Sequence, residues 1–259
     1  MAHWLLRNMI SMALVVILYA PAVSWGATKS MTARTGTIVL LHGIGKSRLD
    51  MVPLEKYLKK HGYRVLNWNY PSTRKDLDAL AVLLHKKLDE DGATTYSFVT
   101  HSMGGIVVRT YLSKFSPKNV SRFVMIAPPN QGAFLADLLG GFTAFKLILG
   151  PAGQQLRRGE NGKCADAGVP ECEFGILAGG AGLTMGMNPI VPGDNDLTVS
   201  VEATMLPGAR DFAVLPYPHP VIQMMPRTCR YVENFLRTGE FGATEKEKRR
   251  VVQKNEAAP

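Results

Sequence analysis

The sequence has few cysteines and no cluster of metal-binding residues. It contains three cysteines in 259 residues, namely Cys164, Cys172 and Cys229. No Cys-x-x-Cys pair is present, and no group of cysteines and histidines has the spacing of a zinc site. We therefore expect no metal and no function that depends on a bound zinc ion.

The sequence also lacks a long hydrophobic run. Its N-terminal apolar stretch, from Ile10 to about Val23, is shorter than the roughly 20 residues that a membrane-spanning helix needs. It follows a positive charge at Arg7 and precedes small residues such as Ser24, an order typical of secretory signal peptides. We predict a signal peptide over residues 1–26 and a periplasmic or secreted protein. An uncleaved membrane anchor and a buried first helix are the alternatives.

Export to an oxidising compartment would permit a disulfide bond. Cys164 and Cys172 flank a short polar loop that can bring two thiols together. We predict that they are bridged, with two free thiols as the alternative, and that Cys229 is a buried thiol on the last helix.

Positive charges outnumber negative ones, but no pattern indicates a nucleic-acid partner. The formal net charge is +9. The basic residues are scattered or lie in a mixed-charge tail at residues 239–259, and aromatic residues are not interleaved with them. We expect no nucleic-acid binding. The tail has few large apolar residues, so we predict that it is disordered.

Short β-rich runs alternate with longer helical patterns from residue 37 onward, which is typical of a parallel sheet with crossover helices. Thr37–His42 is a continuous apolar run, as a strand buried on both faces should be. The alternation breaks at about residues 128–172. We predict one α/β domain over residues 34–238, a mostly parallel sheet with helices on both faces, and a lid insertion at about 128–172. A buried core helix is the alternative for the apolar segment Phe134–Leu149.

The most specific local pattern is Thr100-His101-Ser102-Met103-Gly104-Gly105, between an apolar strand and a helical run. A tight strand–turn–helix holds a serine clear of the sheet and close to a helix N-terminus, as a nucleophile requires. Small residues are needed two positions on either side of the serine. Gly104 meets this requirement, whereas Thr100 stands where glycine is commonest. We predict that Ser102 is a nucleophile; the alternative is a serine in an ordinary strand–helix turn.

The segment from His101 to Gly105 resembles the nucleophile turn of lipases and esterases of the α/β-hydrolase family. The resemblance extends from Thr37 to about Thr238, because two further motifs follow the family's order. It implies an α/β-hydrolase fold and ester hydrolysis. In this family two backbone N–H groups bind the oxyanion, and the matching residues here are Met103 and Ile44, in the turn His42-Gly43-Ile44-Gly45.

The family order of the catalytic residues is serine, acid, histidine. Of the six histidines, only His219 follows Ser102, and prolines flank it on both sides. For the acid, the family pattern Asn-Asp-Gly matches Asn195-Asp196, with Leu197 in place of the glycine. The resemblance therefore implies Asp196, and Asp194 remains the rival.

Together these residues imply a serine hydrolase that cleaves carboxylic esters, of lipids or other acyl compounds, through an acyl-enzyme and without a cofactor. An acyltransferase or a thioesterase would use the same residues. A non-catalytic binding module with this fold is a further alternative. The nearly uncharged segment Phe134–Leu149 would line an acyl groove or contact a membrane surface.

Overall fold

The computed structural model describes residues 36–245, 247 and 248. The predicted signal peptide, residues 1–26, and the last part of the predicted disordered tail lie outside the described residues.

Six parallel strands form one sheet in the order β2-β1-β3-β4-β5-β6. The strands are β1 (Thr37–Leu41), β2 (Arg64–Trp68), β3 (Tyr96–His101), β4 (Val120–Ile126), β5 (Glu173–Gly179) and β6 (Asp211–Leu215). β1 and β3 lie inside the sheet and are almost wholly buried, and the apolar run of β1 fits this position. The predicted α/β fold is confirmed, and the sheet is parallel throughout.

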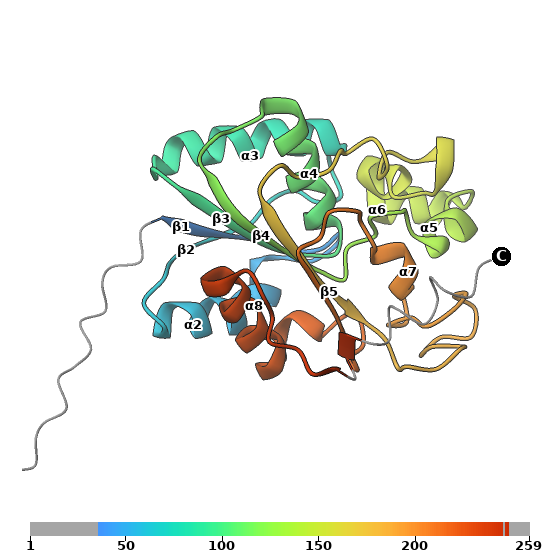
Figure 1. The fold of residues 1–259 in the computed structure, drawn as a ribbon. Helices are drawn as coiled ribbons and strands as arrows, with labels where there is room; N and C mark the ends of the chain where they lie inside the picture. Colours follow the sequence, from blue (N-terminus) through green and yellow to red (C-terminus); the bar gives the residue numbers. More distant parts are fainter. Residues whose placement is uncertain (1–35, 246, 249–259) are drawn as a thin grey trace, which may run out of the picture. The chain divides into compact units, whose positions relative to one another are not determined.

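Helices cover both faces of the sheet (Figure 1). α3 (Leu77–Asp91) and α4 (Met103–Phe115) pack on one face, and α2 (Val52–Lys60) and α8 (Pro226–Thr238) pack on the other. Side chains of successive strand residues point to opposite faces, so Val39 and Leu41 meet one helical layer while Ile38 and Leu40 meet the other. Short helices also occur in the connecting segments, namely η2 (Arg48–Met51), η3 (Gly159–Asn161), α7 (Val201–Thr204) and η4 (Ile222–Met224).

The strand order reverses direction between β1 and β3. After β1 the chain continues to β2 on one side, and after β3 it continues to β4 on the other side. In open α/β sheets, ligands bind outside the carboxyl ends of the strands at this switch point. The glycine-rich turn after β1 and the serine turn after β3 both lie there.

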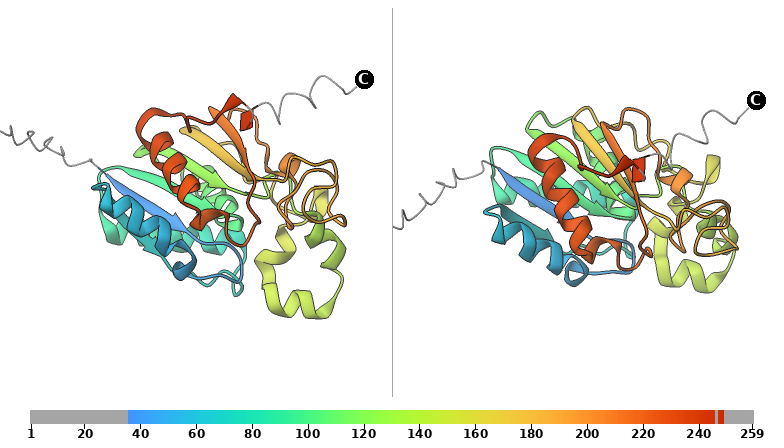
Figure 2. Two further views of the ribbon diagram at one scale, coloured as in Figure 1. Left: turned by 90° about the horizontal axis from the view of Figure 1, so that it is seen from below. Right: turned by 60° about the horizontal axis from the view of Figure 1, so that its bottom comes forward.

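Residues 134–155, here called the α5–α6 segment, follow β4 and comprise α5 (Phe134–Leu139) and α6 (Thr143–Gln155) (Figure 2). α6 is kinked at Gly150, whose φ is 62°. A Cβ at this position would lie only 1.7 Å from the carbonyl oxygen of Thr73. Farther along, the Gln155 side chain accepts a hydrogen bond from Leu77 N–H at 2.7 Å. The close approach at Gly150 and this hydrogen bond hold the second half of α6 against the loop before α3 and the first residue of α3. Movement of the segment as a lid stays a prediction.

The described part of the tail is packed rather than disordered. The Phe241 side chain is fully buried, with its ring 4.9 Å from that of Phe235. The Glu247 carboxylate accepts a hydrogen bond from Tyr231 at 2.8 Å and pairs with Arg227 at 3.0 Å. The disordered tail predicted for residues 239–259 therefore begins too early, because an aromatic side chain beyond residue 238 completes the core against α8.

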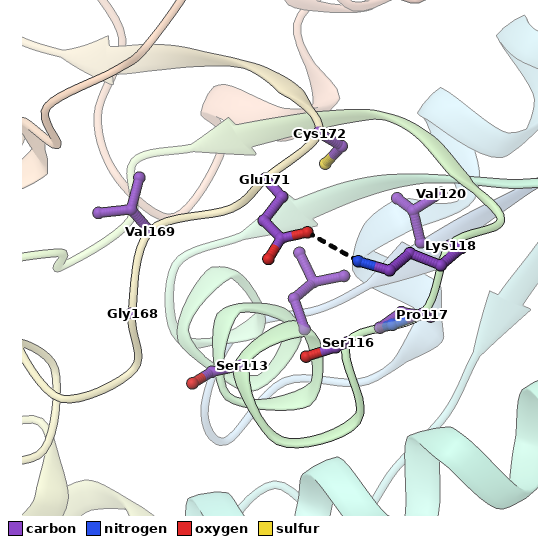
Figure 3. A pocket seen from close by; sticks show the side chains of 10 residues that line it. Ser113, Ser116, Pro117, Lys118, Val120, Gly168, Val169, Glu171 and Cys172 are labelled. Carbon is purple, nitrogen blue, oxygen red and sulfur yellow. Dashed lines mark hydrogen bonds and ion pairs between the residues drawn. The ribbon is translucent and has the colours of Figure 1, made fainter.

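The predicted disulfide between Cys164 and Cys172 is wrong, because both are free thiols. The Cys164 thiol is buried and contacts the carbonyl oxygen of Gln155 at 3.7 Å. Cys172 instead lines a surface pocket beside the ion pair of Lys118 and Glu171 (Figure 3). Between the two cysteines, the Gly168 carbonyl accepts a hydrogen bond from Arg109 of α4 at 2.8 Å, which holds the loop along α4. Cys229 is buried on α8 as predicted.

Candidate active site

Ser102 lies in a strained turn between β3 and α4. Its backbone has φ 54° and ψ −126°, a region that non-glycine residues rarely adopt. The surrounding structure maintains this conformation: Ser102 N–H donates to the Ile126 carbonyl at 2.8 Å, and Gly105 N–H donates to the Ser102 carbonyl at 2.9 Å. The Ser102 side chain therefore lies at the carboxyl end of β3, beside the N-terminus of α4.

The residues around this turn leave just enough room for α4 to approach the sheet. A Cβ on Gly104 would lie 2.9 Å from the carbonyl oxygens of both Leu41 and His42, so a larger residue would separate α4 from β1. A Cβ on Gly105 would lie 3.4 Å from the Thr100 hydroxyl oxygen. Thr100 is fully buried at the position where glycine is commonest, and the missing side chain of Gly105 provides its space.

The three residues predicted to form the triad lie in one hydrogen-bonded chain. The Ser102 hydroxyl oxygen is 3.0 Å from His219 Nε2, and His219 Nδ1 is 2.7 Å from Asp196 Oδ2. Because a carboxylate only accepts hydrogen bonds, Nδ1 carries the proton and Nε2 is the acceptor that faces the serine. Asp196 is completely buried, and its other oxygen accepts hydrogen bonds from the N–H groups of Thr198 and Val199 at 3.0 and 2.8 Å. These donors orient the carboxylate toward His219.

The structure separates the two candidate acids. Asp194 does not reach His219; its oxygens accept hydrogen bonds from the N–H groups of Ala181 and Gly182, at 2.8 and 2.9 Å. It thereby closes the loop that follows β5. Leu197, which stands where the family pattern has glycine, has φ 91°. The backbone thus retains the glycine-like conformation that places Asp196, at a cost in strain that a leucine side chain imposes.

Asn195 supports the loop that carries Asp196, a role that the sequence analysis did not assign. Its buried side-chain amide nitrogen lies within 3.2 Å of four backbone carbonyls, those of Met185, Asn188, Val191 and Gly193. Its oxygen accepts hydrogen bonds from the N–H groups of Asn188 and Leu197. The sequence signal for this role was the place of Asn195 directly before Asp196 in the Asn-Asp pattern. A side-chain amide both donates and accepts hydrogen bonds, so it can hold several backbone groups of one loop.

The two predicted oxyanion-hole residues lie on either side of the serine turn. Met103 is the first residue of α4, where N–H groups have no intrahelical partner. Ile44 lies within a turn that is closed by Lys46 N–H donating to the Gly43 carbonyl at 3.3 Å. A Cβ on Gly43 would lie 3.2 Å from Ser102 Cβ, so this turn passes directly beside the serine. Their role as oxyanion donors stays a prediction.

His42 braces the glycine-rich turn. Its ring is buried and stacks on Tyr70 with centroids 4.2 Å apart, and its Nδ1 lies 2.8 Å from the Gly43 carbonyl. Tyr70 in turn donates its hydroxyl hydrogen to the His42 carbonyl at 2.6 Å. Burial lowers the pKa of His42 below its ordinary value, which favours the neutral ring.

Ser102 and His219 open onto a cavity of about 280 Å³. The α5–α6 segment contributes apolar side chains to its wall, among them Leu135, Phe145 and Leu149. Ser102 and His219 contribute polar groups to the same lining. Within the described part of the chain, no group of three or more His, Cys, Asp or Glu side chains is placed to hold a metal ion.

Comparison with known proteins identifies the family. Residues 38–241 match the alpha/beta hydrolase family. The chain belongs to this family. The match covers the sheet from the second residue of β1 onward and includes Ser102, Asp196 and His219.

Three solved structures illustrate the similarity of fold. The mature lipase BlEst2 of Bacillus licheniformis is 21% identical, with a TM-score of 0.59 over 78% of this chain and 91% of the lipase. The phospholipase PlaB of Legionella pneumophila is 17% identical, with a TM-score of 0.61 over 86% of this chain and 65% of the phospholipase. Lipase B of Aspergillus fumigatus is 12% identical, with a TM-score of 0.60 over 82% of this chain and 55% of the lipase. At these identities the likeness concerns the fold.

Proposed function

We propose that this alpha/beta hydrolase is a serine esterase that cleaves carboxylic esters, with Ser102, His219 and Asp196 as its catalytic triad. The observation that carries the proposal is the hydrogen-bonded chain from the Ser102 hydroxyl through the His219 ring to the buried Asp196 carboxylate. Two of these residues, Ser102 and His219, line a cavity that also has an apolar wall. A buried serine–histidine–carboxylate chain of this geometry activates the serine for attack on an acyl group.

In the acylation half-reaction, Ser102 Oγ attacks the ester carbonyl while its proton passes to His219 Nε2. Asp196 stabilises the imidazolium that forms, and the N–H groups of Met103 and Ile44 donate to the oxyanion. Collapse of the tetrahedral intermediate breaks the ester C–O bond, and the leaving alcohol takes the proton from His219. Water then attacks the acyl-enzyme with His219 as base, which releases the acid and restores the Ser102 hydroxyl.

The apolar surface near the site favours lipid esters as substrates and a membrane surface as their source. Large exposed apolar side chains are concentrated on two segments, the α5–α6 segment (Leu138, Leu139, Phe142, Leu147 and Ile148) and the loop before α7 (Leu183, Met185, Ile190 and Leu197). Both segments lie at the carboxyl end of the sheet (Figures 1 and 2). Grouped apolar side chains of this kind mark contacts with partners or lipid. Among the described helices, none has the length and apolar character needed to cross a bilayer.

Labelling with a fluorophosphonate tests the proposed nucleophile. The purified protein should be labelled at Ser102 and should hydrolyse acyl esters of graded chain length, and Ser102→Ala should lose both properties while remaining folded. Ser113→Ala, which changes an exposed serine on the same helix, should keep both. Labelling at a different serine would contradict the assignment. Adding an alcohol as competing acceptor would show whether acyl transfer exceeds hydrolysis.

Vesicle co-sedimentation tests the proposed lipid contact. Wild-type protein should sediment with vesicles that contain an anionic phospholipid, and Leu147→Ser combined with Ile148→Ser should weaken this binding about tenfold or more, because each buried apolar side chain contributes about 1.5–3 kcal/mol. Val169→Ser, which alters an exposed apolar residue outside both segments, is the matched control. Equal sedimentation of all three proteins would reject the contact.

A further inference from the structure

His101, the last residue of β3, lies between the two loops that flank Ser102. Its side chain is 1% exposed, and Nε2 is 3.0 Å from the carbonyl oxygen of His219. The rings of the two histidines are 4.8 Å apart. On its other side, a Cβ on Gly43 would lie 3.1 Å from His101 Nδ1, so the turn that carries Ile44 packs against the imidazole. One side chain therefore contacts the loops of the proposed base and of the proposed oxyanion hole.

The protonation state of His101 follows from its partners. A carbonyl oxygen only accepts hydrogen bonds, so Nε2 carries the hydrogen that is donated to His219. Burial, and then the neighbouring His219, hold the pKa of His101 well below its ordinary value, so the ring is neutral. Nδ1 is then an acceptor, and none of the described residues donates to it. An unpartnered buried nitrogen lowers stability, and an apolar ring at this position would avoid that loss.

The hydrogen bond that His101 donates holds the main chain of the proposed base, His219. His219 lies between Pro218 and Pro220, and proline has no N–H to donate. The main-chain hydrogen bonds of this short segment therefore depend on the N–H and carbonyl groups of His219. His219 N–H donates to the Asp196 carbonyl at 2.8 Å, and the His219 carbonyl accepts from His101. The main chain of the base is thus attached on one side to the acid residue and on the other to the residue that precedes the nucleophile.

We propose that His101 is a positioning residue, whose Nε2–H holds the His219 main chain so that the His219 ring stays within hydrogen-bonding distance of Ser102. This inference rests on the proposed esterase function. Because His101 and Ser102 are consecutive, any shift of the nucleophile also shifts the group that holds the base. The distance between Ser102 Oγ and His219 Nε2 is thereby protected against movement of either loop.

Three substitutions of His101 separate the hydrogen bond from ring packing. His101→Phe keeps a planar ring without a donor, and His101→Asn has an amide that reaches only as far as Nδ1. His101→Gln places an amide N–H near the position of Nε2. We expect kcat for ester hydrolysis to fall about 10- to 100-fold in the Phe and Asn variants, with KM little changed, since small displacements of reacting groups cost this much. The Gln variant should recover most of kcat. His85→Phe is the control, because His85 stacks on Phe115 of α4, far along the helix from the site.

Proton NMR gives a readout that does not depend on turnover. The hydrogen shared by His219 Nδ1 and Asp196 should give a deshielded, slowly exchanging resonance in the wild type and in His101→Gln. It should broaden or disappear in His101→Phe and His101→Asn, whose thermal unfolding should otherwise show one cooperative transition. A Phe variant with wild-type kcat and resonance, or a Gln variant as impaired as the Phe variant, would overturn the inference. A wild type that neither hydrolyses esters nor reacts with fluorophosphonate would instead contradict the esterase proposal, and the resonance would still test the role of His101.

Discussion

The two walls of the active-site cavity are built in opposite ways. Ser102 and His219 line the polar wall. Behind them, Asp196 is fully buried and each of its oxygens has a backbone or imidazole donor within 3.0 Å. On the apolar wall, α6 turns Phe145 toward the cavity but leaves Leu147 79% and Ile148 68% exposed. Hydrogen bonds depend steeply on distance and angle, whereas apolar contacts are non-directional. Substitutions on the polar wall should therefore act almost as all-or-none changes, and those on the apolar wall should have graded effects.

The largest loss of kcat is expected from His219→Ala, on the polar wall. Removing the base leaves Ser102 protonated and the oxyanion donors intact, so kcat should fall by about 10⁴-fold or more, as far as in Ser102→Ala. Steady-state hydrolysis of a chromogenic ester measures the loss, and His85→Ala is the control. A residual kcat within about 100-fold of wild type would show that the hydrogen-bonded chain is not a catalytic unit.

A smaller loss of kcat is expected from Asp196→Ala, about 10³- to 10⁴-fold, because the oriented carboxylate holds the reactive tautomer of His219. Asp194→Ala should reduce kcat less than about tenfold, since Asp194 does not contact the histidine. It should instead lower the melting temperature, because the N–H groups of Ala181 and Gly182 lose their acceptor. If Asp194→Ala proved more damaging to kcat than Asp196→Ala, the assignment of the acid would be reversed.

Substitutions on the apolar wall should change kcat/KM by moderate amounts. Phe145→Ala enlarges the cavity and removes apolar contacts. We therefore expect kcat/KM for short acyl esters to fall about tenfold, because a small change in apolar contact has an effect of this size. For longer acyl esters kcat/KM should rise. Leu147→Ala, two residues farther along α6 and largely exposed, should leave the chain-length profile unchanged in monomeric esters. Profiles from a series of acyl esters decide the matter. Identical profiles for the two variants would show that Phe145 does not bound the acyl chain.

The smallest effect concerns stability in mild acid. The pKa values of His42 and His101 are lowered in the folded state, chiefly by burial, so the unfolded chain binds more protons below pH about 6.5. Their contribution to stability is present above that pH and is lost as the pH falls below it, by up to about 1.4 kcal/mol per pH unit for each histidine. Urea unfolding at pH 7.5, 6.5 and 5.5 should show this slope, and His101→Gln should reduce it. An unchanged slope in that variant would mean that His101 also takes up its proton when folded.

Local patterns in the sequence were sufficient for the strand–turn–helix at Ser102 and for the alternation of strands and helices along the chain. The turn needs a strand, a serine and small residues within a few positions, and all of these are visible along the chain. His219 followed from the resemblance, because the family places its histidine after the serine and no other histidine comes after Ser102. Reasoning from local patterns misjudged Cys164 and Cys172, which are free thiols. The loop between them is held by Arg109, 59 residues from Gly168, a contact that no local pattern shows. The same reasoning also ended the packed core before Phe241.

The resemblance to the family pattern implied Asp196, and the tertiary structure shows what separates it from Asp194. The two carboxylates are two residues apart in the same loop, and nothing local distinguishes their chemistry. The N–H groups of Ala181 and Gly182 take one carboxylate, and those of Thr198 and Val199 orient the other toward a histidine from a different loop. Likewise, the sequence pattern gives His101 no role of its own, and only folding brings the His219 carbonyl oxygen to 3.0 Å from its ring nitrogen. The sequence by itself determined which residues can perform the chemistry, because that depends on residue type and local backbone. Only the folded loops decided which of them meet, because hydrogen bonds act over a few ångströms between segments far apart in the chain.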